Sequence, residues 1–187
     1  MGYEISLGLA WDELEQISHS GKYGVRLLDE DYLVFVSLRK VLQKTSGQEA
    51  EEMRAVLILH YLLGIKKHGF FPTGEWISFR QLEGGPVFWP AFEENSLVPL
   101  ARGFQECPEG LIANLCQRLS GKIIQGGDVA VEVAVLPGIL VRMIFWKGDS
   151  DLPPAVTMLF DRGLIGIYST EDVTVMLDLV SQESLRI

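Results

Sequence analysis

The sequence predicts an α+β fold, in which an antiparallel β-sheet of hairpins packs with a central buried helix and with amphipathic N- and C-terminal helices. Three observations favour this class. Apolar residues alternate with other residues in the second half of the chain, residues 55–63 are almost uniformly apolar, and apolar residues recur with helical spacing near both ends. With 187 residues, 48% of them hydrophobic, the chain can bury a full core as a single domain over 1–187.

The N-terminal part predicts a helix followed by a hairpin. Acidic residues lie between five apolar residues that share one face of a helix over residues 3–17: Tyr3, Leu7, Ala10, Leu14 and Ile17. Two runs of apolar, β-branched and aromatic residues, 23–28 and 32–38, then flank the acidic triplet 29–31. An acidic turn between two such runs predicts an antiparallel hairpin.

Residues 48–64 carry the pattern of the central helix. Its first turns are charged, and residues 55–63 are then apolar on every side except at His60. A helix that is apolar all round is a buried one, so His60 is expected to face the core. A buried imidazole must be hydrogen-bonded, and two interpretations stay open: a satisfied core histidine, or a ligand-binding or proton-carrying residue.

The segment 68–92 is the densest aromatic stretch of the chain. It holds five of the nine Phe and two of the four Trp, interleaved with Gly and Pro that force turns. One interpretation is a linker that joins possible subdomains 1–67 and 93–187 and fills one core with its rings. The other is a ligand cleft, because pockets combine aromatic walls with a few placed polar groups.

The second half predicts helices over 91–105 and 109–119, followed by strands. Residues 129–135 and 139–145 alternate in hydropathy around Pro137, and a loop wider than two residues would place Glu132 opposite Arg142. Further strands are predicted over 155–160 and 164–168. The last helix begins with a capping box, in which the Ser169 hydroxyl accepts from the third helical amide and Asp172 reaches back.

Composition argues against several classes of function. The formal net charge of −9 and the scattered basic residues exclude a nucleic-acid partner, and the longest apolar runs are too short for a membrane span. Cys107 and Cys116 lack the spacing of a metal site, so we expect no metal and two reduced core thiols. We also expect a cytoplasmic protein. No motif identifies a cofactor or a known catalytic site.

Five polar and aromatic residues are the candidates for a ligand site: His60, Trp76, Ser78, Arg80 and Asp149. Arg80 is the clearest of them, because a guanidinium group can hold a carboxylate or phosphate in a fork and can stack on a neighbouring ring such as Trp76 or Phe79. The alternative role of Arg80 is a salt bridge to Asp149, Asp161 or Glu93. No catalytic residue can be assigned from the sequence.

The chain resembles an uncharacterised family of bacterial and archaeal anaerobes, a domain-of-unknown-function family. In the first half the resemblance rests on His60-Tyr61-Leu62-Leu63, on Trp76-Ile77-Ser78-Phe79-Arg80-Gln81-Leu82, on Gly84-Gly85 and on Phe92. In the second half it rests on Leu136-Pro137, Trp146-Lys147-Gly148-Asp149, Leu159-Phe160-Asp161 and Thr170-Glu171-Asp172. Some members look like fusions to a four-cysteine module similar to that of the corrinoid iron–sulfur protein, whose cysteines this chain lacks.

The resemblance implies a role beside iron–sulfur or corrinoid proteins. The leading expectation is a non-catalytic binding or accessory module in anaerobic corrinoid or one-carbon metabolism. One alternative is an enzyme of unrecognised type that uses a cleft lined by the 68–92 segment. The other is a structural protein-interaction domain.

Overall fold

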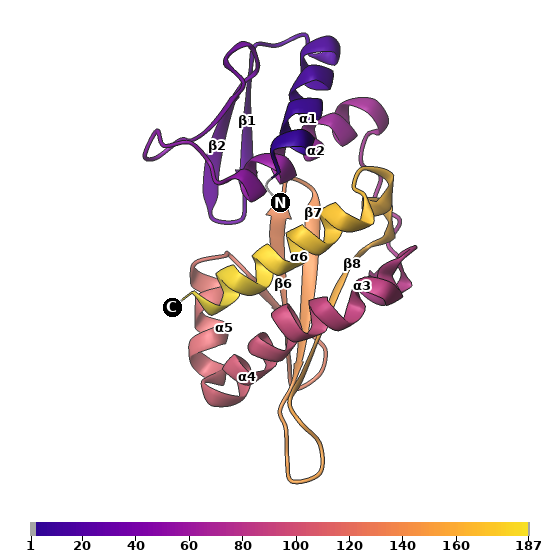
Figure 1. Ribbon diagram of the computed structural model, residues 1–187. Coiled ribbons are helices and arrows are strands. Elements are labelled where there is room, and N and C mark those ends of the chain that lie inside the picture. Colours follow the sequence, from indigo (N-terminus) through magenta and orange to yellow (C-terminus); the bar gives the residue numbers. More distant parts are fainter. Residues whose placement is uncertain (1–2, 187) are drawn as a thin grey trace.

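The computed structural model describes residues 3–186 and has an α+β architecture with two antiparallel sheets (Figure 1). The smaller sheet has the order β1-β2-β3 and lies at one end of the molecule beside the first two helices. Its elements, in chain order with these helices, are α1 (Glu4–Ile17), β1 (Lys22–Leu27), β2 (Glu30–Phe35), β3 (Lys40–Gln43) and α2 (Glu52–His68). The predicted N-terminal helix and hairpin are therefore present.

The larger sheet has five strands in the order β4-β8-β7-β6-β5, all antiparallel. The strands are β4 (Trp76–Ser78), β5 (Lys122–Ile124), β6 (Val129–Leu136), β7 (Ile139–Trp146) and β8 (Ala155–Asp161). The two three-residue strands, β4 and β5, form the edges. The long strands β6, β7 and β8 form the centre, where the alternating pattern was strongest.

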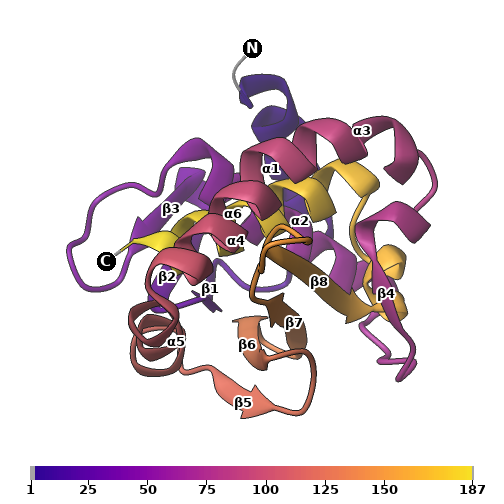
Figure 2. The ribbon, with the colours of Figure 1, turned by 90° about the horizontal axis from the view of Figure 1, so that it is seen from below.

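Helices cover one face of the larger sheet (Figure 2). They are α3 (Gly85–Phe92), α4 (Val98–Glu106), α5 (Pro108–Gln117) and α6 (Thr170–Leu185), with a π-helical turn, Glu93–Leu97, joining α3 to α4. Phe104 of α4 packs on Phe145 of β7 with ring centroids 4.9 Å apart. The buried side chains of β7, which alternate along the strand, therefore pack against the helices.

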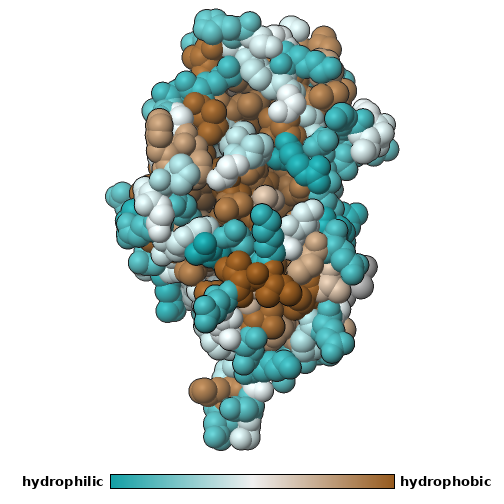
Figure 3. Space-filling model, turned by 180° about the vertical axis from the view of Figure 1, so that it is seen from behind, coloured by the Kyte–Doolittle hydropathy of each residue, from teal (hydrophilic) through white to brown (hydrophobic). Residues whose placement is uncertain are grey.

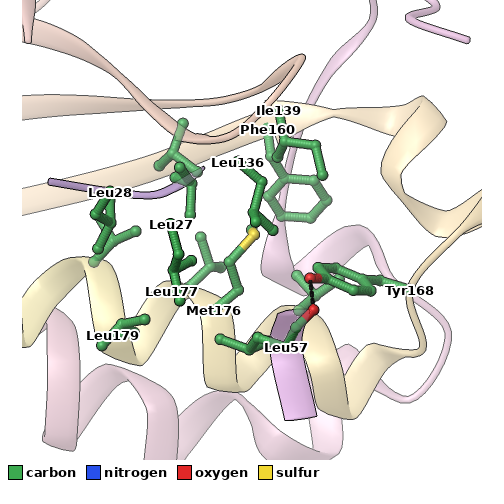
Figure 4. Packing of buried hydrophobic residues seen from close by; sticks show 14 of the residues in the cluster. Leu27, Leu28, Leu57, Leu136, Ile139, Phe160, Tyr168, Met176, Leu177 and Leu179 are labelled. Atoms are coloured by element: carbon green, nitrogen blue, oxygen red, sulfur yellow. Dashed lines mark hydrogen bonds between the residues drawn. The ribbon is translucent and has the colours of Figure 1, made fainter. Parts of the chain in front are cut away.

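The core is one hydrophobic cluster that contains residues of both sheets, α2 and α6. Leu57, Ile58 and Leu59 of α2 are fully buried, as the uniformly apolar run predicts. Figure 4 shows Leu57 beside Tyr168, Met176 and Leu177, and the Tyr168 hydroxyl donates to the Leu57 carbonyl oxygen at 2.6 Å. Burying these large apolar side chains stabilises the fold by roughly 1.5–3 kcal/mol each.

The β6–β7 hairpin has the predicted register but a different loop. Glu132 pairs with Arg142, and their side chains form an ion pair at 2.8 Å. The loop consists of Pro137 and Gly138 alone, however, and not of the wider loop that the register demanded. A β-bulge between Ala134 and Leu136 supplies the extra residue, because a bulge lets two residues of one strand oppose one of the other.

Several local predictions are wrong. Residues 164–168 form no strand but lie within and just after a 3₁₀ helix, Arg162–Gly166. The short strands β3, β4 and β5 were not predicted, since three or four residues carry too little periodicity. Cys107 is exposed rather than a core thiol, because it lies between α4 and α5. The segment 68–92 contains the end of α2, then β4 and α3.

The other face of the larger sheet carries no helix of the described chain. Its middle strand presents Leu140, Arg142, Ile144 and Trp146 there, all partly or largely accessible to solvent. Figure 3 views the molecule from behind, and apolar side chains gather on this side among polar ones. The sheet is thus covered on one face only, a common arrangement for antiparallel sheets.

Candidate functional site

A cavity of about 460 Å³ lies at the N-terminal end of α6. We call it the α6 cavity. Nine residues from two segments line it: Ile77, Gln81, Leu82 and Glu83 from the aromatic segment, and Arg162, Ile165, Tyr168, Ser169 and Thr170 from the connection between β8 and α6. Its walls are therefore part apolar and part polar, as in small-molecule sites.

Both walls are fixed by local hydrogen bonds. A capping box at Ser78 and Gln81 holds the 3₁₀ turn that follows β4, with the Ser78 amide donating to Gln81 Oε1 at 2.9 Å. Across the cavity, the Thr170 hydroxyl donates to the Glu83 carbonyl oxygen at 2.9 Å. This bond joins the two walls at the start of α6.

A second hollow, of about 470 Å³, lies at the end of α1. Its lining consists of Glu15, residues 18–21, Val36 and Ser37, so Val36 is its one apolar member. A surface of this kind offers little apolar area to an organic ligand, whereas ligand pockets are mostly apolar. The α6 cavity is the better candidate for a binding site.

The cation at the cavity wall is Arg162. Its guanidinium group binds Glu75 through two hydrogen bonds of 2.6 and 2.8 Å. The hydrogen bonds that Arg162 donates to Glu75 raise the pKa of Arg162, so this group is always charged. A fork of this geometry is suited to a carboxylate, which is the group that it already holds.

His60 and Asp172 meet beside the α6 cavity. Asp172 Oδ1 lies 2.6 Å from His60 Nδ1, and Asp172 Oδ2 accepts from the Ser169 amide and hydroxyl at 3.1 and 2.7 Å. Burial raises the pKa of the Asp172 carboxyl, but the bonds from His60 and Ser169 outweigh it and hold the pKa below its usual value. Asp172 is therefore ionised at neutral pH and can only accept.

The ionised carboxylate fixes the tautomer of a neutral His60. Because Asp172 has no proton to give, His60 Nδ1 must carry the proton of their bond. The other ring nitrogen, Nε2, then has a free lone pair, and it lies 3.3 Å from Ser6 Oγ on α1. The Ser6 hydroxyl donates to it. Three helices thus bring a hydroxyl, an imidazole and a carboxylate into one line.

His60 is more exposed than the core position predicted for it. The His60 side chain is 25% exposed and that of Asp172 12%, and Ser6 is half-buried. His60 faces α1 and α6 at the edge of the core, and both of its ring nitrogens have side-chain partners. The prediction that the imidazole is hydrogen-bonded is compatible with this geometry; the prediction that it is buried is not.

Trp76 and Arg80, two of the predicted site residues, lie outside the α6 cavity. Trp76 stacks against the Arg142 guanidinium group, 3.5 Å from its ring centroid, on the uncovered face of the sheet. Arg80 stacks on Trp89 at 4.2 Å, not on Trp76 or Phe79, and is exposed. Both arginine–aromatic pairs lie at the surface.

The other predicted residues are dispersed. Ser78 contributes the cap described above, one hydrogen bond from the cavity wall. Asp149 lies in the β7–β8 loop, where it accepts from the amides of Asp151 and Leu152, and these bonds lower its pKa. Asp161 accepts from Thr73, Gly74 and Gly163 and ties the aromatic segment to the end of β8. Of the five, His60 alone contacts the Asp172 group.

Sequence reasoning missed Ser6, and it gave Asp172 and Ser169 a capping role only. The capping role is real, since both hydrogen bonds of the box are present. The signal in the sequence is His60 itself, because a polar residue within the apolar run 55–63 needs a hydrogen-bond partner. Which partner it finds depends on how α1 and α6 cross α2, and this is a tertiary property.

The family of the chain follows from a comparison with protein families. A family described as "Domain of unknown function (DUF3786)" matches residues 7–183. The chain belongs to this family. Neither the curated proteins nor the solved structures provide a match. Membership covers nearly all of the fold described above, and it carries no assigned activity.

Two further properties concern the described residues. Between residues 3 and 186, no group of three or more His, Cys, Asp and Glu side chains lies close enough to hold a metal ion. In the same part of the chain, no helix has the length and apolar character needed to cross a bilayer.

Proposed function

We propose that this protein is a binding module that takes a small organic ligand in the α6 cavity. The observation that carries the proposal is the lining of that cavity. Ile77, Leu82 and Ile165 supply apolar wall, and Arg162 supplies a forked cation at the edge. A volume of about 460 Å³ falls in the range of pockets that bind small molecules and cofactors.

The charges at the wall indicate the ligand's chemistry. The Arg162 fork already binds the Glu75 carboxylate, and this pair is exposed enough to open without burying a charge. A ligand carboxylate competes with Glu75 for the same donors. The expected ligand therefore has an apolar body and one anionic end.

The resemblance to anaerobe proteins gives this ligand a context. It supports a role in corrinoid or one-carbon metabolism, beside an iron–sulfur or corrinoid protein and in the cytoplasm. A whole corrinoid, with its ring and side arms, is larger than the cavity. We therefore propose that the cavity holds a smaller metabolite, or one arm of a corrinoid whose ring stays outside.

Native mass spectrometry tests the proposal. The protein is purified from an anaerobic host, and its mass is measured before and after incubation with cobalamin and with its phosphate-bearing benzimidazole nucleotide fragment. We expect a mass excess of one ligand per chain. Arg162→Ala should reduce its occupancy at least tenfold, because the forked contact is lost.

A matched variant controls for the loss of a surface arginine. Arg26 also pairs with an acidic residue, Asp31, at an exposed site remote from the cavity in the β1–β2 hairpin. Arg26→Ala should bind as the unchanged protein does. An apo mass under every condition, or equal occupancy in both variants, would refute the binding role of the α6 cavity. Pull-down from the same extract would then test the partner class.

A further inference from the structure

We propose that Ser6, His60 and Asp172 form a nucleophile, base and orienting group that hydrolyse esters. The three residues come from α1, α2 and α6, and they are far apart in sequence. Their contacts follow the order that activates a serine: hydroxyl to Nε2 at 3.3 Å, then Nδ1 to carboxylate at 2.6 Å. This activity is separate from ligand binding in the α6 cavity.

The environment of each group suits its role. Asp172 is the most buried of the three, is ionised, and is held by Ser169, so it orients the imidazole. His60 is partly exposed, and Ser6 is half-buried at the surface of α1. The nucleophile is thus the group that a substrate can reach. The distance of 3.3 Å is typical of such pairs before a substrate tightens them.

The proposed reaction is a two-step acyl transfer. Ser6 Oγ attacks the ester carbonyl carbon and forms a C–O bond while its proton moves to His60 Nε2. The bond between the carbonyl carbon and the leaving alcohol breaks, and His60 returns the proton to that alcohol. Water then attacks the acyl-Ser6 carbon with its proton going to His60, and the acid leaves as Ser6 Oγ regains a proton.

Ser6 is the third residue of α1, in the first turn of the helix. Amides in a first turn point toward the N-terminus and carry the positive end of the helix dipole. The remaining free amides of this turn can donate to a carbonyl oxygen beside Ser6 Oγ, while the Tyr3 amide already donates to Glu52 Oε2 at 3.4 Å. The position of Ser6 in the first turn of α1 therefore places backbone donors near the proposed nucleophile.

The charges around Ser6 select the substrate. Glu52 Oε2 accepts from the Tyr3 amide at 3.4 Å, one turn before Ser6, and Glu171 is the neighbour of Asp172 in the first turn of α6. Carboxylates beside the site repel an anion. The substrates are neutral or cationic esters, and esters with a second, anionic carboxylate react more slowly.

A fluorophosphonate probe tests the site. Ser6 Oγ displaces fluoride from phosphorus, and peptide mapping locates the added phosphonyl mass. We expect the label on Ser6 in the full chain and none in Ser6→Ala. His60→Gln should slow labelling by about 10²- to 10⁴-fold, since the base is lost. Hydrolysis of p-nitrophenyl acetate should exceed that of the anionic mono-p-nitrophenyl succinate.

Ser18→Ala is the control, because Ser18 follows the last residue of the same helix. It should label at the rate of the unchanged protein, and thermal melts should show that all variants are folded. An unlabelled protein, a label on another serine, or persistent labelling of Ser6→Ala would overturn the proposal. Labelling that His60→Gln leaves unchanged would also overturn it.

Discussion

The two ends of α6 carry acidic residues in opposite settings. Near the N-terminal end, Asp172 contacts a histidine and Ser169, and the group reaches the surface. Near the C-terminal end, the Glu183 side chain is 6% exposed and pairs with the guanidinium groups of Arg54 and Arg118. The second cluster consists of a carboxylate and guanidinium groups, whereas the first contains an imidazole, whose two ring nitrogens can donate and accept a hydrogen bond.

We interpret the Glu183 cluster as structural and the Asp172 cluster as functional. Arg118 also binds Asp29 at 2.7 Å and thereby joins α5 and α6 to the turn of the β1–β2 hairpin. The Glu183 cluster thus ties three parts of the fold together through groups that satisfy one another. The Asp172 cluster ends at Ser6, a hydroxyl at the surface.

Removing Glu183 should have the largest effect on stability. Glu183→Ala leaves Arg54, whose side chain is 10% exposed, buried without its partner. Breaking one side of a buried ion pair costs about 3–5 kcal/mol. Chemical denaturation should show a loss of this size, while Glu51→Ala, at an exposed site 3.9 Å from the same arginine, should change stability little. Equal effects would contradict the structural role assigned to the buried Glu183 cluster.

His60→Gln should have an intermediate effect, about 1.5–3 kcal/mol, because a hydrogen bond to a charged group is lost. The exposed His68 provides the control, His68→Gln, which should be close to neutral. Denaturation at neutral pH measures both. A loss as large as that of Glu183→Ala would mean that His60 has chiefly a structural role.

The stability of His60→Gln should also depend less on acidic pH than that of the unchanged protein. Since the folded pKa of Asp172 is lowered, its contribution to stability is present above the unfolded pKa and is lost as pH falls through the folded pKa. His60→Gln lets that folded pKa rise toward its ordinary value. The variant should therefore lose less stability on acidification than the unchanged protein. If the stability of the two proteins falls equally with pH, His60 does not lower the folded pKa of Asp172.

Ser169→Ala should have the smallest effect, about 1 kcal/mol, the typical value of an N-cap side chain. It removes the bond that Asp172 Oδ2 receives from the Ser169 hydroxyl but keeps the carboxylate and His60. A thermal melt measures it. A loss several times larger would show that the cap, rather than His60, holds Asp172 in place.

The sequence predicts what depends on local pattern. The capping box of α6 and the Glu132–Arg142 register both follow from residues within a few positions of one another or from hairpin geometry. The bulge near Val135 was not predicted. A two-residue loop and the Glu132–Arg142 pairing are incompatible in a regular hairpin, and the alternating pattern does not show that a bulge can reconcile them. Short edge strands were missed for lack of periodicity.

The candidate sites depend on packing between distant elements. Ser6 and Asp172 meet His60 only because α1 and α6 lie against α2, and no spacing along the chain predicts that. Likewise, the α6 cavity joins residues 77–83 to residues 162–170. Trp76 was a candidate by composition, yet its place on β4 directs it to the opposite face of the sheet, against Arg142.

The tautomer of His60 tests most directly whether the N-terminal end of α6 is arranged for proton transfer. A long-range ¹H–¹⁵N spectrum of the imidazoles, assigned with His60→Gln, distinguishes the two ring nitrogens in the neutral form. We expect the proton on Nδ1, toward Asp172, and an unprotonated Nε2 toward Ser6. A neutral ring protonated on Nε2 would contradict this arrangement, because it could not accept the Ser6 proton.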